Sequence, residues 1–268
     1  MIYYPLSILM QAGIHEILII STPEDTPRFQ KLLGRGEKIG LILHYAVQEK
    51  PKGIAEALLI AKSFFAGKEM ALILGDNLFF GDHFSLLLHK VVREFNKGAY
   101  LFGYPVKNPS RYGVFGFDEK GKVSSIEEKP KFPKSSYAVA GLYFYDKEAI
   151  SLAESLTPSQ RGELEISDLN ALYLQKKRLQ VALLGRGSAW LDTGTIDALQ
   201  QASLFVQTIQ ERQGIKIACI EEVAYQNGWI SLQQLKLLAK QYANDYSEYL
   251  KGIVEMEDQK FSKEVVLR

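Results

Sequence analysis

The stretch Met70-Ala71-Leu72-Ile73-Leu74-Gly75-Asp76-Asn77 carries the strongest structural signal in this chain of 268 residues. Its first five residues are apolar without interruption, which is typical of a strand that is buried on both faces of a sheet. The strand ends at a Gly-Asp-Asn turn, and ligands of open α/β sheets bind at the carboxyl ends of strands. Asp76 is therefore either a ligand of a hard cation or a turn residue that is bonded to nearby backbone.

Helical and strand patterns alternate on both sides of this strand. Strands are expected over residues 14–20 and 41–47, and helices over residues 22–34, 54–65 and 84–95. This alternation favours a parallel sheet with helices on both faces and right-handed crossovers. The chain itself opens on a helical pattern, whereas a doubly wound sheet usually begins with a strand. Either this first helix packs elsewhere, or a first strand and its loop are missing.

The pattern changes after residue 98. Strands are expected over residues 100–106, 112–117, 122–127, 137–145 and 179–184, and helices over residues 147–156, 164–177 and 195–212. From there to its end the chain reads as helical and polar. We therefore predict one α/β domain over residues 1–212 and a C-terminal helical region over residues 213–268.

Charge and composition exclude several classes of protein. Lys and Arg number 32 against 31 Asp and Glu, and this net charge of +1 does not favour binding to nucleic acid or to an anionic membrane. The one cysteine, Cys219, permits no internal disulfide, so a reducing compartment is expected. The most apolar stretch, residues 1–20, is interrupted by polar residues and lacks the features of a membrane span or signal peptide. We therefore expect a soluble, cytoplasmic protein.

Three further segments hold candidate site residues, each with a structural alternative. Asp192, in Trp190–Thr195, is either a second carboxylate for the same ion or a cap of the following helix. Lys129, in Glu127–Pro130, is either a point charge for a phosphate or part of a solvated turn. Arg161 is either a phosphate clamp or an ordinary loop cation. The sequence contains neither a Walker A nor a GxGxxG loop, and its four histidines lack metal-ligand spacing.

Taken together, these segments resemble the glucose-1-phosphate thymidylyltransferase family. The matching motifs, in order, are Leu74–Asn77, Arg111–Val114, Glu127–Pro130, Tyr137–Tyr145, Arg161–Ile166 and Trp190–Gly194, with Met1–Leu6 and Ile17–Phe29 at the start. The resemblance extends to about Leu250. It implies a Rossmann-like nucleotidyltransferase fold, a three-layer α/β/α sandwich with a mixed sheet and a C-terminal helical appendage.

The resemblance also implies a reaction and a set of site residues. The reaction is the Mg²⁺-dependent conversion of dTTP and glucose 1-phosphate to dTDP-glucose and pyrophosphate, in deoxysugar synthesis of the dTDP-rhamnose type for cell-surface polysaccharide. Implied roles are Mg²⁺ binding for Asp76 and Asp192, nucleotide binding for Gln48, Gly53 and Asp76, and glucose 1-phosphate binding for Tyr112, Gly113, Glu128, Lys129, Val139, Arg161 and Trp190. Lys129 and Arg161 would be the catalytic cations. The family usually has a Pro-Asp pair before the glycine, and this chain has Pro51-Lys52.

One departure from the family concerns its opening. The family begins with a strand and a loop of the form Gly-Gly-x-Gly-Thr-Arg-Leu, followed by a lysine, and none of this precedes Met1. Because that segment grips the triphosphate in the family, we expect a member without its N-terminal part to turn over slowly or not at all. The resemblance further implies a homotetramer with a feedback site for a dTDP-sugar near the C-terminal helices. A non-catalytic nucleotide-sugar-binding homologue, a sibling enzyme that uses UTP, CTP or ATP, and an assembly subunit without a ligand remain as alternatives.

Overall fold

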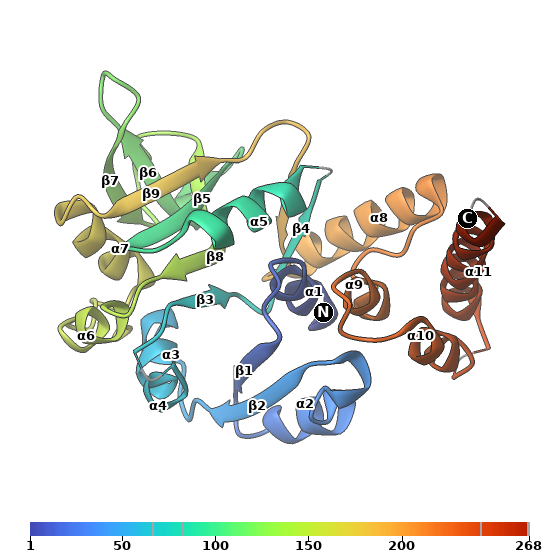
Figure 1. The fold of residues 1–268 in the computed structure, drawn as a ribbon. Helices are drawn as coiled ribbons and strands as arrows, with labels where there is room; N and C mark the ends of the chain where they lie inside the picture. Colours follow the sequence, from blue (N-terminus) through green and yellow to red (C-terminus); the bar gives the residue numbers. More distant parts are fainter. Residues whose placement is uncertain (66, 82, 242, 267–268) are drawn as a thin grey trace.

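The computed structural model describes the backbone of every residue except 66, 82, 242 and 267–268, and the side chains as far as residue 259. The strands form a parallel pair, an antiparallel pair and a larger mixed sheet, with helices around them (Figure 1). No helix in the described part of the chain is long and apolar enough to cross a lipid bilayer.

The N-terminal third follows the predicted alternation of helices and strands. Its elements are α1 (Tyr3–Gln11), β1 (Glu16–Ser21), α2 (Thr26–Leu33), a 3₁₀ turn (Glu37–Ile39), β2 (Ile42–Val47), α3 (Ile54–Ile60), α4 (Lys62–Phe65), β3 (Met70–Ile73), β4 (Asn77–Phe80) and α5 (Phe84–Glu94). The single helix expected over residues 54–65 is in fact two, with Ala61 as the C-cap of α3 between them. The short strand β4 was not expected.

The middle of the chain contributes most of the mixed sheet. Its elements are β5 (Ala99–Pro105), a 3₁₀ turn (Pro109–Arg111), β6 (Gly113–Phe117), β7 (Val123–Glu128), β8 (Tyr137–Tyr145), α6 (Ala149–Glu154), α7 (Ile166–Gln175), β9 (Leu179–Leu183), β10 (Ala189–Asp192) and α8 (Ile196–Gln213). All are close to the predicted ranges except β10, which was not expected as a strand.

Strand β8 is the centre of the mixed sheet. Along one edge it pairs antiparallel with β5, and its other edge is shared by β6 near Ala138 and by β3 over residues 142–145. Strand β9 runs parallel to β5. The parallel sheet expected for the first half is therefore wrong for β3, since among the described residues there only β1 and β2 pair in parallel. An uninterrupted apolar run indicates burial but not strand direction.

Two apolar clusters cover the two faces of this sheet. One cluster joins α3, α6 and α7 to β5 and β8 through residues such as Leu58, Leu101 and Leu169. The other joins α1 and α5 to the same strands through residues such as Ile8 and Leu88. The predicted three-layer α/β/α architecture with a mixed sheet is thus confirmed.

The C-terminal region is helical, as predicted. It contains α9 (Ile220–Gln226), α10 (Leu232–Ala239) and α11 (Asp245–Val266). These helices share one apolar cluster with α1, β1 and β2. The side chain of Asn227 donates to the carbonyl of Met10 at 2.7 Å, which ties α9 to the end of α1. The division into domains at residues 212/213 falls at the end of α8 and stays a prediction.

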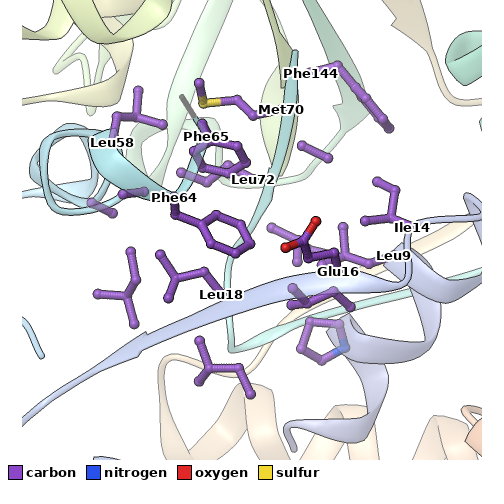
Figure 2. Close-up of a pocket in the computed structure, with 18 of the residues that line it drawn as sticks. Leu9, Ile14, Glu16, Leu18, Leu58, Phe64, Phe65, Met70, Leu72 and Phe144 are labelled. Carbon is purple, nitrogen blue, oxygen red and sulfur yellow. The ribbon is translucent and has the colours of Figure 1, made fainter. Parts of the chain in front are cut away.

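An apolar cavity of about 550 Å³ separates β1 from β3. In the described part of the chain, β1 pairs with β2 alone and β3 with β8 alone, so neither strand has a neighbour on the cavity side. Figure 2 shows Leu18 of β1, Leu72 of β3 and Phe64 of α4 around this space. The cavity thus interrupts what would otherwise be a continuous sheet.

Neighbouring residues of β1 border this cavity but differ in their packing, so they should respond differently to truncation. Ile19 is 7% exposed and belongs to the cluster with the C-terminal helices, so Ile19→Ala should lower the free energy of unfolding by about 2–4 kcal/mol. Leu18 is half-buried, borders the cavity and belongs to none of the three apolar clusters of described residues. Leu18→Ala should therefore cost about 1 kcal/mol or less. Urea unfolding measures both values, and equal losses would contradict this account of the cavity.

Candidate active site

The pairing of β4 with β10 brings the two candidate metal ligands together. These strands are antiparallel, with Asn77 opposite Asp192. Both the N–H and the hydroxyl of Thr193 donate to the carbonyl of Asp76, at 2.9 and 3.0 Å. A Cβ added at Gly194 would lie 3.6 Å from Oδ2 of Asp76 and 3.6 Å from Oδ2 of Asp192. The two carboxylates therefore face one small space that a glycine leaves open.

Each of these carboxylates accepts hydrogen bonds on its other oxygen. Asn77 Nδ2 donates to Asp76 Oδ1 at 2.7 Å, and the Tyr112 hydroxyl donates to Asp192 Oδ1 at 2.6 Å. Arg111 Nη2 lies 3.3 Å from Asp192 Oδ2. Burial, followed by the bond to Asp192 and the charge of that carboxylate, raises the pKa of Tyr112 to about 12, so the phenol keeps its proton at neutral pH and remains a donor.

The residues present fit a hard cation that is only partly enclosed by protein. Mg²⁺ is usually held by one or two carboxylates, with water and substrate phosphates as its remaining ligands. Within the part of the chain that the structure describes, no group of three or more His, Cys, Asp and Glu side chains is arranged for a metal. The helix cap next to Asp192 is Thr195, whose hydroxyl accepts the N–H of Ala198, so the alternative role of Asp192 as a cap is wrong.

A second group of predicted residues meets at the ends of β6 and β7. Gly113 lies opposite Glu128 in the register of these strands. A Cβ added at Gly113 would lie 2.9 Å from Ser167 Oγ, 3.3 Å from Glu128 Oε2 and 3.6 Å from a methyl group of Val139. The Ser167 hydroxyl donates to Glu128 Oε2. Only glycine lets Ser167 and Glu128 come so close to position 113. The bond from Ser167 fixes one oxygen of the Glu128 carboxylate.

Two cations border the Glu128 carboxylate. Lys129 Nζ and Arg161 Nη2 each lie 3.9 Å from Glu128 Oε1. Lys129 adopts a left-handed backbone conformation with φ of 41°, and its N–H donates to the carbonyl of Tyr112 at 3.0 Å. Arg161 Nη2 lies 2.9 Å from both oxygens of Glu165, and this bond raises the pKa of the guanidinium. Positive charge is thus fixed beside the Glu128 carboxylate.

Trp190 packs behind the first group. Its ring centroid lies 5.2 Å from that of Tyr112 and 5.9 Å from that of Tyr104. Its indole N–H donates to Asn77 Oδ1 at 2.6 Å. The buried ring therefore supports both Asn77 and Tyr112, the residues that bond the paired aspartates.

The predicted nucleotide-binding segment is tied to the loop that carries Arg161. Gln48 directly follows β2, and its Nε2 donates to the carbonyl of Gly53 at 3.2 Å and to Glu56 Oε2 at 2.6 Å. The N–H of Leu164 donates to the carbonyl of Lys52 at 2.7 Å. Residues that are far apart in the sequence thus form one continuous surface.

Three buried polar residues that bond the predicted site residues have no feature in the sequence that marks them as part of the site. Asn77, Ser167 and Glu165 are buried, at 2%, 4% and 7% exposure, and each bonds a predicted site residue. Each also stands beside or inside a motif that was recognised for other residues. Burial of a polar side chain next to such a motif is the feature that identifies them.

Comparison with known proteins finds relatives along nearly the whole chain. The family model described as Nucleotidyl transferase matches residues 1–209. The glucose-1-phosphate thymidylyltransferase of Neisseria meningitidis is 51% identical over 251 residues, which cover 93% of this chain and 87% of that protein. The protein of the same name from Xanthomonas campestris is 52% identical over 255 residues, covering 94% of this chain and 86% of that protein.

Solved structures show the same fold. One described as a glucose-1-phosphate thymidylyltransferase from Bacillus anthracis, in complex with a sucrose, has a TM-score of 0.68 at 38% identity and covers 76% of this chain and 81% of that chain. A UDP-glucose pyrophosphorylase complexed with UDP-glucose has a TM-score of 0.66 at 21% identity, covering 77% of this chain and 86% of that chain. At that identity the second likeness concerns the fold alone.

Removal of either paired carboxylate should abolish tight cation binding. Mn²⁺ is a suitable probe, because it takes the same oxygen ligands and its binding is measured by electron paramagnetic resonance. Asp76→Asn and Asp192→Asn should each raise the Kd of Mn²⁺ about tenfold or more, since a charge-assisted contact contributes about 1.5–3 kcal/mol. Asp118→Asn, in the turn between β6 and β7, is the matched control and should leave the Kd unchanged. An equal Kd of Mn²⁺ in all three variants would show that the aspartate pair is not the cation site.

Proposed function

The chain belongs to the glucose-1-phosphate thymidylyltransferase family of nucleotidyl transferases, and from this premise we propose that it makes dTDP-glucose and pyrophosphate from dTTP and glucose 1-phosphate. The observation that carries the proposal is the meeting of Asp76 and Asp192 beside a pocket edged by Glu128, Lys129 and Arg161. Such a site combines a place for a cation with fixed positive charge, which is what nucleotidyl transfer between two phosphates requires.

The proposed reaction is a displacement at phosphorus. A phosphate oxygen of glucose 1-phosphate attacks the α-phosphorus of dTTP in line. A new P–O bond forms while the bond from the α-phosphorus to the bridging oxygen breaks, and pyrophosphate leaves with that electron pair. The attacking oxygen is already ionised at neutral pH, so no general base is needed. Catalysis then depends on positioning and charge neutralisation.

The sugar phosphate would be held by the Glu128 pocket. Lys129 and Arg161 would bind its phosphate, and Arg161 is pre-oriented for this by Glu165. Glu128, with one oxygen fixed by Ser167, would accept hydrogen bonds from sugar hydroxyls on the other. Gly113 and Val139 would line the pocket, and Tyr112 and Trp190 would form its aromatic wall.

The nucleotide would lie between Gln48 and the paired aspartates. The Nε2 group of Gln48 already donates to Gly53 and Glu56, and its Oε1, which has no partner among the described residues, would accept the N–H of thymine. Asp76 and Asp192 would hold Mg²⁺, the cation that fits two carboxylates completed by phosphate oxygens. When bound, that ion offsets the negative charge of the phosphates.

Ligand binding distinguishes this proposal from its alternatives. Isothermal titration should show that dTDP-glucose binds more tightly than UDP-glucose, CDP-glucose or ADP-glucose. Preference for another nucleotide would make the protein a sibling transferase, and no binding of any of them would support a subunit without a ligand. The paired aspartates favour a catalyst over a non-catalytic homologue, because a binding module does not require both.

One further expectation that comes from the resemblance stays a prediction. It is a homotetramer with a dTDP-sugar feedback site, which light scattering with and without the sugar nucleotide tests.

The planar head of Arg161 should matter beyond its charge. Arg161→Lys keeps the charge, but an ammonium cannot bond Glu165 through two nitrogens and a phosphate at the same time. The Kd of glucose 1-phosphate, measured by titration calorimetry, should rise about 10- to 100-fold, as expected for loss of one charge-assisted bond. The matched control is Arg186→Lys, on an exposed loop, which should bind like the parent protein. A similar Kd for Arg161→Lys and the parent would show that the planar head of Arg161 does not hold the phosphate.

A further inference from the structure

Asn77 is a buried polar residue whose side chain bonds two residues of the candidate site and the backbone of β8. It is 2% exposed. Its Nδ2 donates to Asp76 Oδ1 at 2.7 Å, while its Oδ1 accepts the indole N–H of Trp190 at 2.6 Å and the N–H of Gly141 at 3.1 Å. The reverse orientation of the amide would place its NH₂ group against two donors and its oxygen against a carboxylate. The chemistry of the neighbours therefore fixes the amide in one orientation.

A second contact chain leads from Trp190 to the other aspartate. The Trp190 ring packs 5.2 Å from that of Tyr112, and the Tyr112 hydroxyl donates to Asp192 Oδ1 at 2.6 Å. The backbone carbonyl of Tyr112 accepts the N–H of Lys129. A continuous path thus runs from Asp76 through Asn77, Trp190 and Tyr112 to Asp192, with a branch to the sugar-phosphate pocket.

The bonds from Asn77 and Tyr112 do not involve the Oδ2 atoms of the two aspartates. Asn77 and Tyr112 each occupy an Oδ1 atom, and the two Oδ2 atoms face the common space at Gly194. Among the described residues, the one further contact on this side comes from Arg111, which is 45% exposed and whose Nη2 lies 3.3 Å from Asp192 Oδ2. Within that part of the chain, an arriving cation needs to displace only this surface arginine.

We propose that Asn77 and Tyr112 are positioning residues that couple the cation site to the Trp190 wall of the sugar-phosphate pocket. A ligand packed on the partly exposed Tyr112 restrains its ring and the buried Trp190 ring behind it, and through their bonds it fixes the two carboxylates in the orientation that a cation needs. By thermodynamic reciprocity, the cation raises the affinity for the sugar phosphate by the same factor. The inference rests on the proposed function for the identity of the two ligands.

The coupling factor is measured with Mn²⁺ and glucose 1-phosphate. The Kd of Mn²⁺ is determined by electron paramagnetic resonance without the sugar phosphate and with a saturating amount of it. In the parent protein the sugar phosphate should lower that Kd about fivefold or more, the usual lower range for coupled sites. Tyr112→Phe removes one hydroxyl and should both raise the Kd of Mn²⁺ about tenfold and bring the coupling factor close to one. Asn77→Ala should do the same.

Tyr104→Phe is the matched control. Tyr104 also packs on Trp190, but its hydroxyl donates to the backbone carbonyl of Ser188 instead of to an aspartate. This variant should keep the parent Kd and coupling factor. Direct coordination of Mn²⁺ by the sugar phosphate would give coupling that persists in Tyr112→Phe, and such a result would overturn the proposal. If Asn77→Ala does not fold, Tyr112→Phe alone decides.

A spectroscopic measurement separates positioning from a loss of structure. Trp190 and Trp229 are the two tryptophans of the chain, so Trp229→Phe leaves Trp190 as the one reporter. Mg²⁺ should shift its emission in that background and should not shift it after Tyr112→Phe and Asn77→Ala are added together, with folding checked by circular dichroism. An unchanged shift would overturn the proposal. Failure of the parent protein to bind either ligand would instead refute the proposed function.

Discussion

The antiparallel pairing of β4 with β10 is the constraint on which the candidate site depends. It sets Asp76 and Asp192 at one end of a four-residue ladder, where two like charges face the same space. Such a pair is stable only with compensating donors or a cation. Asn77 and Tyr112 supply donors to the two Oδ1 atoms, so the geometry for a cation is prepared before any ion arrives, while the exposed Arg111 on Asp192 Oδ2 is a contact that the cation displaces. Prepared donors of this kind need no reorganisation during reaction.

The sequence indicates the long strands better than the short ones. Strand β8 and the core of β3 are apolar runs, and their burial follows directly from hydrophobicity. Strands β4 and β10 have four residues each, too few for a periodic pattern, and β10 includes the polar Asp192. Their pairing joins segments that are distant in the chain, so it depends on the tertiary fold and not on local propensity. The same reason explains why the antiparallel direction of β3 was not foreseen.

The site residues show a similar division. Asp76, Glu128 and Trp190 were found because they stand in recognisable motifs, whereas their hydrogen-bond partners were not. Lys129 and Arg161 illustrate the difficulty: taken alone, each is an ordinary surface cation. Their partners Glu128 and Glu165 are close to them in the sequence, but the approach of Arg161 to Glu128 joins two distant segments. Charge pattern along a sequence cannot show such a long-range contact.

The cavity between β1 and β3 reaches the edge of this site, since both Gln48 and Gly75 border it. The Asp76 turn therefore has no strand on its cavity side within the described residues, and its support comes from elsewhere. The N–H of Leu74 donates to the carbonyl of Gly141, and the N–H of Gly141 donates to Asn77 Oδ1. Strand β8 thus anchors the turn from one side while β10 holds it from another. Because neither anchor involves β1, the aspartate pair keeps its geometry independently of the cavity, whereas the Gln48 segment, which follows β2, lies across the gap. Any flexibility that the cavity permits should fall on the Gln48 segment and leave the aspartate pair rigid.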